Sequence, residues 1–490
     1  MATPNRAGGV DMPAKSVCPV THEGAHDGGA PPATHSPSKR FSTLRSTASA
    51  LYKGWGFEDG IYAGLAGHDF SSFRVGLRRY AAVTRPEYVE HILFEHPDRY
   101  HKSIDFAAVD GAIGVGIFSD NGDSWKHHRK ILNPMFTRKH LENVFDLMVA
   151  PVEEAAAALP QQPAEIEIHD IMVELTLDVV GNAIFYENFK EYFPDDLGWW
   201  ITEGLTEVMA FARVLMVAEP PAWLNKPFWK LIHSNVRVPP PLSNLQKATK
   251  IVLGGVDAIL ADRAANPKDT PDLLNLMLKC IDDGTMTPER VRSEATVHML
   301  AGHETTATTM SFLWHLLSQN HWARDRMLEE VDTVLEGRTP TTADLRNLPW
   351  TAACVDETMR LYPPVWFSPR TAIVDDVIGG HHVKAGTTVV VPAFLIGRDP
   401  RWWPNPEVFD PSRFMPGADA GRNRGAFTPF SGGPRTCIGR NLALMETVLI
   451  AAKFSQTHTF ETVPGHRMEP QATPSLRPRY GLRVIASPRR

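Results

Sequence analysis

The chain of 490 residues is 43 % hydrophobic and 22 % charged, so it can bury a large core and is neither disordered nor collagen-like. Its 50 Lys and Arg against 56 Asp and Glu leave a net charge of −6, which argues against a chain built mainly to bind nucleic acid. The cysteines Cys18, Cys280, Cys354 and Cys437 lie too far apart for a disulfide scaffold, a zinc finger or a C-x-x-C-H attachment motif. A reducing cytoplasm is therefore the expected location.

The N-terminal region predicts a tail followed by one large unit. The first forty residues hold six prolines and five glycines without an apolar run, which excludes a signal peptide. We expect residues 1–45 to form a disordered tail and residues 46–490 a single folded domain. No stretch reaches the roughly eighteen apolar residues of a membrane-spanning helix, so we expect a soluble protein without a transmembrane segment.

Helical periodicity dominates the middle of the chain. Apolar residues recur three and four apart over 139–160, 168–186 and 245–264. The aromatic segment 211–229 is interrupted by prolines and is too broken for one helix. These patterns predict several helices before residue 265.

A long central helix is predicted next. Thr287 can cap it, Pro288 suits its first position, and nothing interrupts it before about residue 320. The later elements are predicted helices over 321–336 and 350–362, short strands at 377–378 and 387–391, and a last helix just after Cys437. The sequence therefore predicts a mostly α fold with a small β portion.

The segment from Phe430 to Gly439 reads F-S-G-G-P-R-T-C-I-G and points to a metal-bound sulfur. Free cysteines are usually inert and buried, but the three glycines here let backbone turn tightly and a flat ligand approach. Cys437 also lies just before a predicted helix, with Arg435 two residues away, and both features favour a thiolate.

This segment resembles the haem-binding loop of the cytochrome P450 family. The family's fixed positions correspond to Phe430, Gly433, Arg435, Cys437 and Gly439. The resemblance implies a cytochrome P450 catalytic domain over 46–490, with haem b held between the long central helix and the cysteine loop. It also implies that Cys437 is the thiolate ligand of the haem iron, the arrangement that favours O–O cleavage in this class.

A second motif of the family lies 80 residues before Cys437. Glu357 and Arg360 stand three apart on a predicted helix, and such pairs are usually surface ion pairs. Here they resemble the family's Glu-x-x-Arg motif, and Arg413 matches the arginine that joins it. The resemblance implies a structural role for all three residues.

The long helix carries the sequence A-G-H-E-T-T in its middle. An acid beside a hydroxyl in a buried helix is costly unless it is hydrogen-bonded or used. The segment is similar to the family's oxygen-binding groove, in which Ala301 and Gly302 leave room beside the haem. Glu304 and Thr305 match its acid–alcohol pair, which implies that they pass protons to bound dioxygen.

Arginines and a tryptophan match positions that bind the haem propionates in the family. Trp125 and Arg129 stand four apart on a predicted helix, and Arg370 and Arg435 are similar further partners. Arginine suits this task because its planar fork matches a carboxylate.

The resemblance implies a soluble bacterial monooxygenase that inserts one atom of O2 into a lipophilic substrate, such as a fatty acid, terpenoid, steroid or polyketide-like molecule. The matching pocket segments are mostly apolar and cover 104–118, 208–223, 365–367 and the turn around Leu476. The alternatives are a peroxide-driven peroxygenase, which commonly lacks the acid–threonine pair, and a haem-binding sensor without turnover.

We expect electrons from NAD(P)H to arrive through a reductase and a separate ferredoxin or flavodoxin-type carrier, since the length leaves no room for a fused reductase. An acidic carrier would be steered by a basic surface composed of Lys126, Arg129, Lys130, Arg422, Arg424, Arg435 and Arg440.

Overall fold

The computed structural model describes residues 38–40, 42, 64–194, 196–218, 222–240, 242–473 and 475–489. The predicted tail lies almost entirely outside this part of the chain, as does its predicted boundary at residues 45 and 46. Within the tail, Lys39 and Arg40 form a short strand, β1, that pairs with Ser71 and Ser72. The described residues all belong to one compact unit, Ser36–Arg490.

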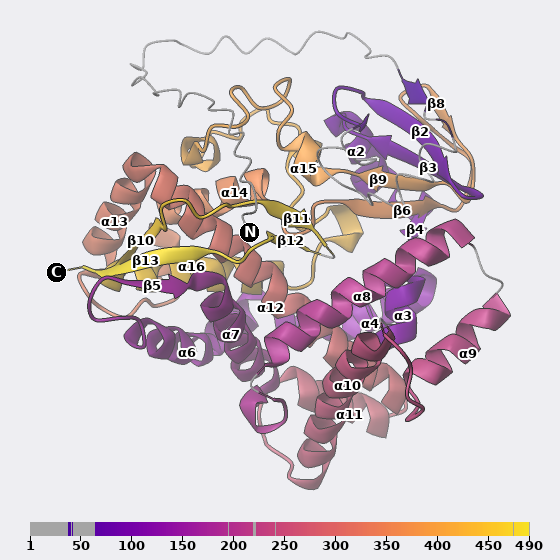
Figure 1. Cartoon of the computed structure of the whole chain (residues 1–490), viewed down its shortest axis with the longest axis horizontal. Helices are drawn as coiled ribbons and strands as arrows, with labels where there is room; N and C mark the ends of the chain where they lie inside the picture. Colours follow the sequence, from indigo (N-terminus) through magenta and orange to yellow (C-terminus); the bar gives the residue numbers. More distant parts are fainter. Residues whose placement is uncertain are drawn as a thin grey trace, which may run out of the picture. The chain divides into compact units, whose positions relative to one another are not determined.

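Helices make up most of this unit (Figure 1), as the sequence predicts. They are α2 (Pro86–Glu90), α3 (Ala107–Ile113), α4 (Gly122–Leu132), α5 (Arg138–Asn143), α6 (Phe145–Ala157), α7 (Ile168–Val180), α8 (Leu197–Ala218), α9 (Ala222–Ile232), α10 (Leu242–Ala265), α11 (Leu273–Asp282), α12 (Pro288–Gln319), α13 (His321–Leu335), α14 (Pro349–Leu361), α15 (Ala393–Ile396) and α16 (Arg440–Thr457). The predicted helix over 139–160 is divided into α5 and α6, because Val144 leaves helical geometry.

The described strands form four sheets, two of which are the two-stranded pairs β7-β8 and β11-β12. They are β1 (Lys39–Arg40), β2 (Phe70–Val75), β3 (Arg78–Val83), β4 (Tyr100–Lys102), β5 (Ala164–Glu167), β6 (Ser368–Ala372), β7 (Asp376–Ile378), β8 (His381–Val383), β9 (Thr388–Val391), β10 (His458–Thr462), β11 (Pro470–Ala472), β12 (Leu476–Pro478) and β13 (Arg483–Pro488). The largest sheet has the order β1-β2-β3-β9-β6-β4, and β10-β13-β5 form a second sheet near the C-terminus (Figure 1).

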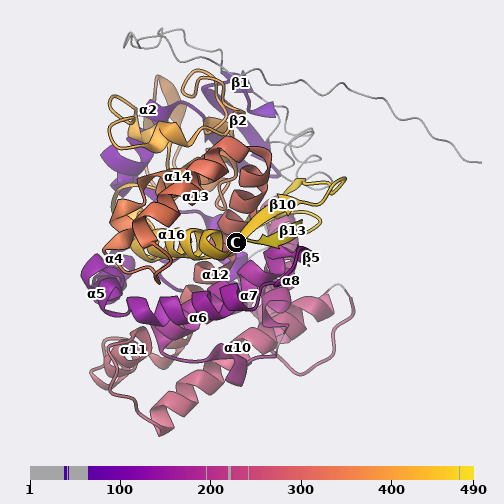
Figure 2. The same ribbon diagram turned by 90° about the vertical axis from the view of Figure 1, so that its left-hand side faces the viewer.

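Helix α12 is the central element of the core. Its first turn is capped as predicted, since the Thr287 hydroxyl accepts a hydrogen bond from the Arg290 amide. It packs on α7, α10, α14 and α16, and Figure 2 shows these helices stacked in layers above and below it. Gly302 allows the closest of these contacts, because a Cβ there would lie 2.7 Å from a methyl group of Val180 on α7.

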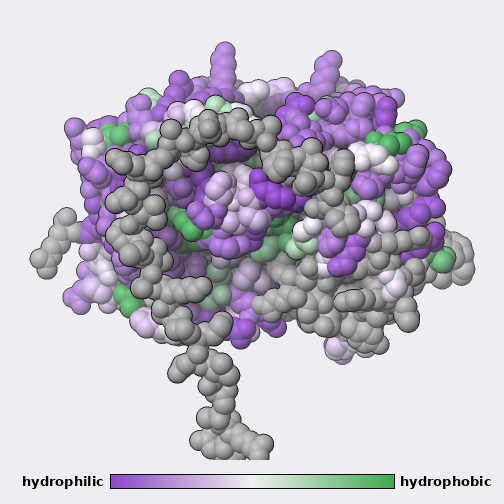
Figure 3. All heavy atoms as spheres, turned by 90° about the horizontal axis from the view of Figure 1, so that it is seen from above, coloured by the Kyte–Doolittle hydropathy of each residue, from purple (hydrophilic) through white to green (hydrophobic). Residues whose placement is uncertain are grey.

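No helix in the described part of the chain has the length and hydropathy needed to cross a bilayer. The face in Figure 3 is largely hydrophilic where it is coloured, with scattered apolar side chains.

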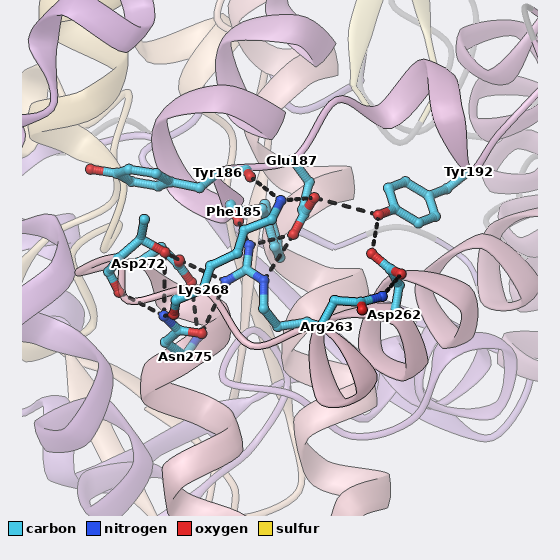
Figure 4. Close-up of polar contacts among 11 residues, drawn as sticks. Phe185, Tyr186, Glu187, Tyr192, Asp262, Arg263, Lys268, Asp272 and Asn275 are labelled. Carbon is cyan, nitrogen blue, oxygen red and sulfur yellow. Dashed lines mark hydrogen bonds and ion pairs between the residues drawn. The ribbon is translucent and has the colours of Figure 1, made fainter.

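A buried ion network ties α10 and α11 to the turn that follows α7 (Figure 4). The Arg263 guanidinium is 1 % exposed and lies between two buried carboxylates. Its Nη1 donates to Asp272 Oδ2 at 2.7 Å, and its Nε donates to Glu187 Oε1 at 2.9 Å. Lys268 Nζ donates to the other Glu187 oxygen at 2.7 Å, so every charge in the network has an opposite partner.

We expect Arg263→Ala to lower the free energy of unfolding by about 3–5 kcal/mol, because it leaves Asp272 buried without a counter-charge and leaves Glu187 with Lys268 alone. The matched control is Arg292→Ala, which breaks the exposed pair with Asp257 and should cost less than about 1 kcal/mol. The measurement is urea unfolding of both variants and the parent. Equal losses in the two variants would contradict this assignment.

Three histidines on α7 and α12 are held neutral, and one of them, His303, is fully buried. Burial lowers the pKa values of His169, His303 and His315 to about 4. His303 is the most isolated of them, because its Nε2 has no hydrogen-bond partner among the described residues. Between about pH 6.5 and pH 4, these histidines are protonated in the unfolded chain and neutral in the folded chain. The free energy of unfolding therefore falls as the pH falls through this window.

We expect His303→Gln to flatten this acid dependence, since one such histidine accounts for about 3 kcal/mol over the window. The urea midpoint of parent and variant would be compared at pH 7, 5.5 and 4.5. His382→Gln, which changes an exposed histidine on β8, is the control. The assignment fails if His303→Gln retains the full acid dependence of the parent.

Candidate functional site: a cationic pocket around Cys437

The loop before α16 holds Cys437 with its side chain accessible. The Cys437 amide donates to the Phe430 carbonyl at 2.9 Å, which closes the loop on itself. The Cys437 side chain is accessible to solvent, but it lies deep among protein atoms. This burial raises the pKa of its thiol. The Gly439 amide and the cations Arg129 and Lys102 oppose that rise. A bound metal cation is the additional charge that would hold this sulfur as a thiolate.

The glycines of the loop serve close packing more than ligand approach. A Cβ at Gly432 would collide with the Phe94 ring, and one at Gly433 would collide with the Leu93 carbonyl oxygen. Both contacts belong to the π-helical turn His91–Glu95, which lies directly behind the loop. Gly439 is different, since a Cβ there would meet only the Cys437 sulfur, at 3.9 Å. Of the three, Gly439 alone fits the predicted role of clearing space beside the sulfur.

Four cationic side chains gather around the same sulfur. Lys102 on β4 is the cross-strand partner of Arg370 on β6, so these two like charges stand side by side. Burial and the nearby charge of Arg435 lower the pKa of Arg370 to about 10. Burial and the nearby charge of Arg129 likewise lower the pKa of Arg435 to about 10. Burial and all three arginines lower the pKa of Lys102.

Two of these cations are anchored by protein groups. Arg435 donates to the Asp120 carbonyl at 2.7 Å and lies over the Trp125 ring, 3.8 Å from its centre. Arg370 donates to the Ser431 hydroxyl at 2.8 Å. The structure thus brings Trp125 and Arg435 together, and their binding of the haem propionates stays a prediction.

The other two cations have no polar partner. Neither Lys102 Nζ nor the Arg129 guanidinium forms a hydrogen bond or ion pair with any residue that the structure describes. Lys102 was not predicted from the sequence, because a lysine at the end of a short strand has no distinctive spacing. Half-buried, mutually repelling cations without a described polar partner fit a ligand that carries two carboxylates, as haem does.

The A-G-H-E-T-T segment of α12 has one face that the described residues leave uncovered. Ala301 on this face is exposed, although most residues of the helix around it are buried. The Thr305 hydroxyl lies one turn further on the same face and donates to the Ala301 carbonyl at 2.9 Å. Gly302 faces Val180, so only Ala301 meets the prediction that both residues leave room for a ligand.

Glu304 points away from Thr305. Its carboxylate is 5 % exposed and accepts a hydrogen bond from the Ser475 hydroxyl at 2.7 Å. Burial raises its pKa, opposed by Ser475 and by the charge of Arg477. Consecutive helical residues project about 100° apart, and no hydrogen bond joins these two described side chains. In this structure the acid and the alcohol are thus hydrogen-bonded to different partners, and Ser475, which the sequence did not reveal, is the partner of the acid.

Glu357, Arg360 and Arg413 form a buried ion network, in agreement with the structural role predicted for them. Arg360 donates to both Glu357 oxygens, at 2.6 and 2.7 Å, and Arg413 Nε lies 3.5 Å from the same carboxylate. Arg360 also donates to the Pro406 carbonyl at 2.7 Å. Gly397 packs here as well, because a Cβ would collide with the Arg360 carbonyl oxygen.

The comparisons with known proteins agree with this site. The cytochrome P450 family model matches residues 67–485. A putative cytochrome P450 132 of Mycobacterium bovis is 42 % identical over 451 residues, covering 92 % of this chain and 96 % of the relative. Cyclooctat-9-en-7-ol 5-monooxygenase of Streptomyces melanosporofaciens is 28 % identical, covering 82 % and 85 %.

The crystal structure of the cytochrome P450DA heme domain has the same fold. It superimposes with a TM-score of 0.71 over 86 % of this chain and 89 % of its own, at 22 % identity. With a family model spanning most of the sequence and a close mycobacterial relative, the chain belongs to the cytochrome P450 family and is a haem-dependent monooxygenase that takes electrons from NAD(P)H through redox partners.

Proposed function

We propose that this chain inserts one oxygen atom of O2 into a lipophilic substrate, with Cys437 as the sulfur ligand of the haem iron. The observation that carries the proposal is the set of unpaired cations beside an exposed cysteine. Lys102, Arg129, Arg370 and Arg435 would bind the two propionates. The haem, when bound, supplies the capacity to activate dioxygen.

The protein contributes a hydroxyl and an acid on α12. Thr305 Oγ1 holds a proton on the uncovered face of the helix, where its only described acceptor is the Ala301 carbonyl. Glu304 is the nearest acid along the helix, and its raised pKa favours a carboxyl group that retains a proton. We propose that Glu304 exchanges protons through Ser475 and supplies Thr305 after its side chain turns from Ser475.

A lipophilic substrate is supported by the apolar side chains on the predicted pocket segments. Val115 and Phe118 follow α3, and Val365 follows α14, and all three are more than a third exposed. By their names, two relatives act on hydrocarbon skeletons, cyclooctat-9-en-7-ol and carotene. Within the lipophilic classes expected from the sequence, these names favour a terpenoid-type substrate.

A separate carrier would dock on cations that remain free. Arg424 pairs with Glu90, and Arg422 lies over the rings of Trp403 and Phe414, so both are already engaged. The side chains of Lys130 and Arg440 are exposed and make no ion pair with any described residue. We therefore propose that Lys130 and Arg440 attract the acidic ferredoxin or flavodoxin-type donor.

Replacing Cys437 by Ser removes the proposed sulfur ligand. We expect the reduced, carbon monoxide-bound protein to lose the long-wavelength Soret band of the parent. Cys280→Ala, at a buried cysteine on α11, should retain that band. Identical spectra for Cys437→Ser and the parent would refute the assignment of Cys437.

Replacing Thr305 by Ala removes the hydroxyl from the uncovered face of α12. We expect the amount of product per electron consumed to fall several-fold, while the carbon monoxide spectrum stays that of the parent. Thr309→Ala, one turn further on, deletes a hydroxyl that bonds only to the Thr305 carbonyl and serves as the control. Unchanged coupling in Thr305→Ala would favour the peroxide-driven enzyme, and absence of any product from the parent would favour a sensor.

A further inference from the structure

A second cluster of potential metal ligands lies outside the haem site. His91, Glu95 and His96 each offer one ligand atom, and these atoms lie within 4.8 Å of one another. The two imidazole rings are 4.4 Å apart between centres. Two imidazoles and a carboxylate are a ligand set that zinc accepts, with a water molecule in the fourth position.

A π-helical turn creates this cluster. The His96 amide donates to the His91 carbonyl at 2.9 Å, five residues back. In an ordinary α-helix, residues five apart project about 140° from one another, so the two rings would not meet. The wider π turn brings them to one side, and such turns are frequent at functional sites.

Asp376 orients the first histidine. His91 Nε2 lies 2.9 Å from Asp376 Oδ2, and this carboxylate is 2 % exposed. It also accepts from Arg99 Nη1 at 2.7 Å and from the Tyr100 hydroxyl at 2.6 Å. An acceptor held this firmly places the imidazole proton on Nε2, which leaves Nδ1 of the neutral ring as a free ligand atom. A carboxylate behind a histidine is the usual second partner of a metal-binding imidazole.

The remaining ligand groups have little else to bind. His91 Nδ1 faces the Glu95 carboxylate at 4.0 Å, which is the only ion pair of Glu95 within the described ranges. The His96 ring forms no hydrogen bond with a described residue. Both groups are accessible, since the Glu95 side chain is 51 % exposed and His96 is half-buried.

We propose that His91 Nδ1, Glu95 and His96 bind a divalent transition metal ion, best matched by zinc, with Asp376 holding His91 in place. The turn that carries them packs against Gly432 and Gly433 of the cysteine loop. A bound ion therefore braces the segment that supports Cys437 from behind.

The test uses the full, haem-loaded chain without a histidine tag. After dialysis against low micromolar zinc chloride, elemental analysis gives the zinc-to-iron ratio, and the haem iron serves as internal standard. We expect one zinc per iron in the parent and at least a tenfold loss of affinity in His96→Ala and in Glu95→Gln. His321→Ala is the matched control, because His321 and Glu461 form a similar pair at 3.3 Å without a second histidine.

Thermal unfolding provides an independent measurement. Zinc should raise the unfolding midpoint of the parent and of His321→Ala, and leave that of His96→Ala unchanged, since a ligand stabilises only the state that binds it. His96 is the preferred site for substitution because its ring makes no hydrogen bond whose loss would unfold the protein. A parent without stoichiometric zinc overturns the proposal, and so does zinc binding that persists in His96→Ala or disappears in His321→Ala.

Discussion

The repulsion between Lys102 and Arg370 is the constraint on which the functional site depends. They stand opposite each other on neighbouring strands, where side chains are about 5 Å apart and like charges destabilise a sheet. Arg129 and Arg435 add further positive charge, and Asp120, the acid beside Arg435, forms an ion pair with Arg290. The mutual repulsion of these positive charges is relieved when an anion binds between them. The two carboxylates of a haem would supply this negative charge, so we expect haem binding to stabilise this sheet edge.

Rigid structures surround the site and hold its parts at fixed positions. The cysteine loop cannot shift toward the turn behind it, because the backbone at Gly432 and Gly433 already touches that turn. On another side, Glu357 and Arg360 fix the end of α14 to the segment around Pro406. These buried charges are costly to desolvate and are kept by full hydrogen bonding, which favours one geometry over many.

The sequence predicted the helices and the motifs well, and the contacts between them poorly. Periodicity located α12 almost to the residue, because caps and apolar spacing are local signals. Thr305 and Glu304 lie on the predicted central helix, but the hydrogen-bond partner of Glu304 could not be predicted, since Ser475 is distant in sequence. Lys102 was missed for the same reason, because its significance arises only when β4 pairs with β6. The positions of Cys437, Arg435 and Trp125 could be predicted because a family motif already encodes their tertiary arrangement.

Asp376 connects the strand that carries Lys102 to the turn behind the cysteine loop. It accepts hydrogen bonds from Arg99 and Tyr100, and Lys102 lies two residues after Tyr100 on β4, so Asp376 anchors the start of this strand. Through His91 it also holds the turn that supports the cysteine loop. One buried acid on β7 is thus bound both to the strand that carries Lys102 and to the turn behind the Cys437 loop. Since neither Lys102 nor Cys437 contacts Asp376 directly, a change at Asp376 acts on the site only by moving these two segments.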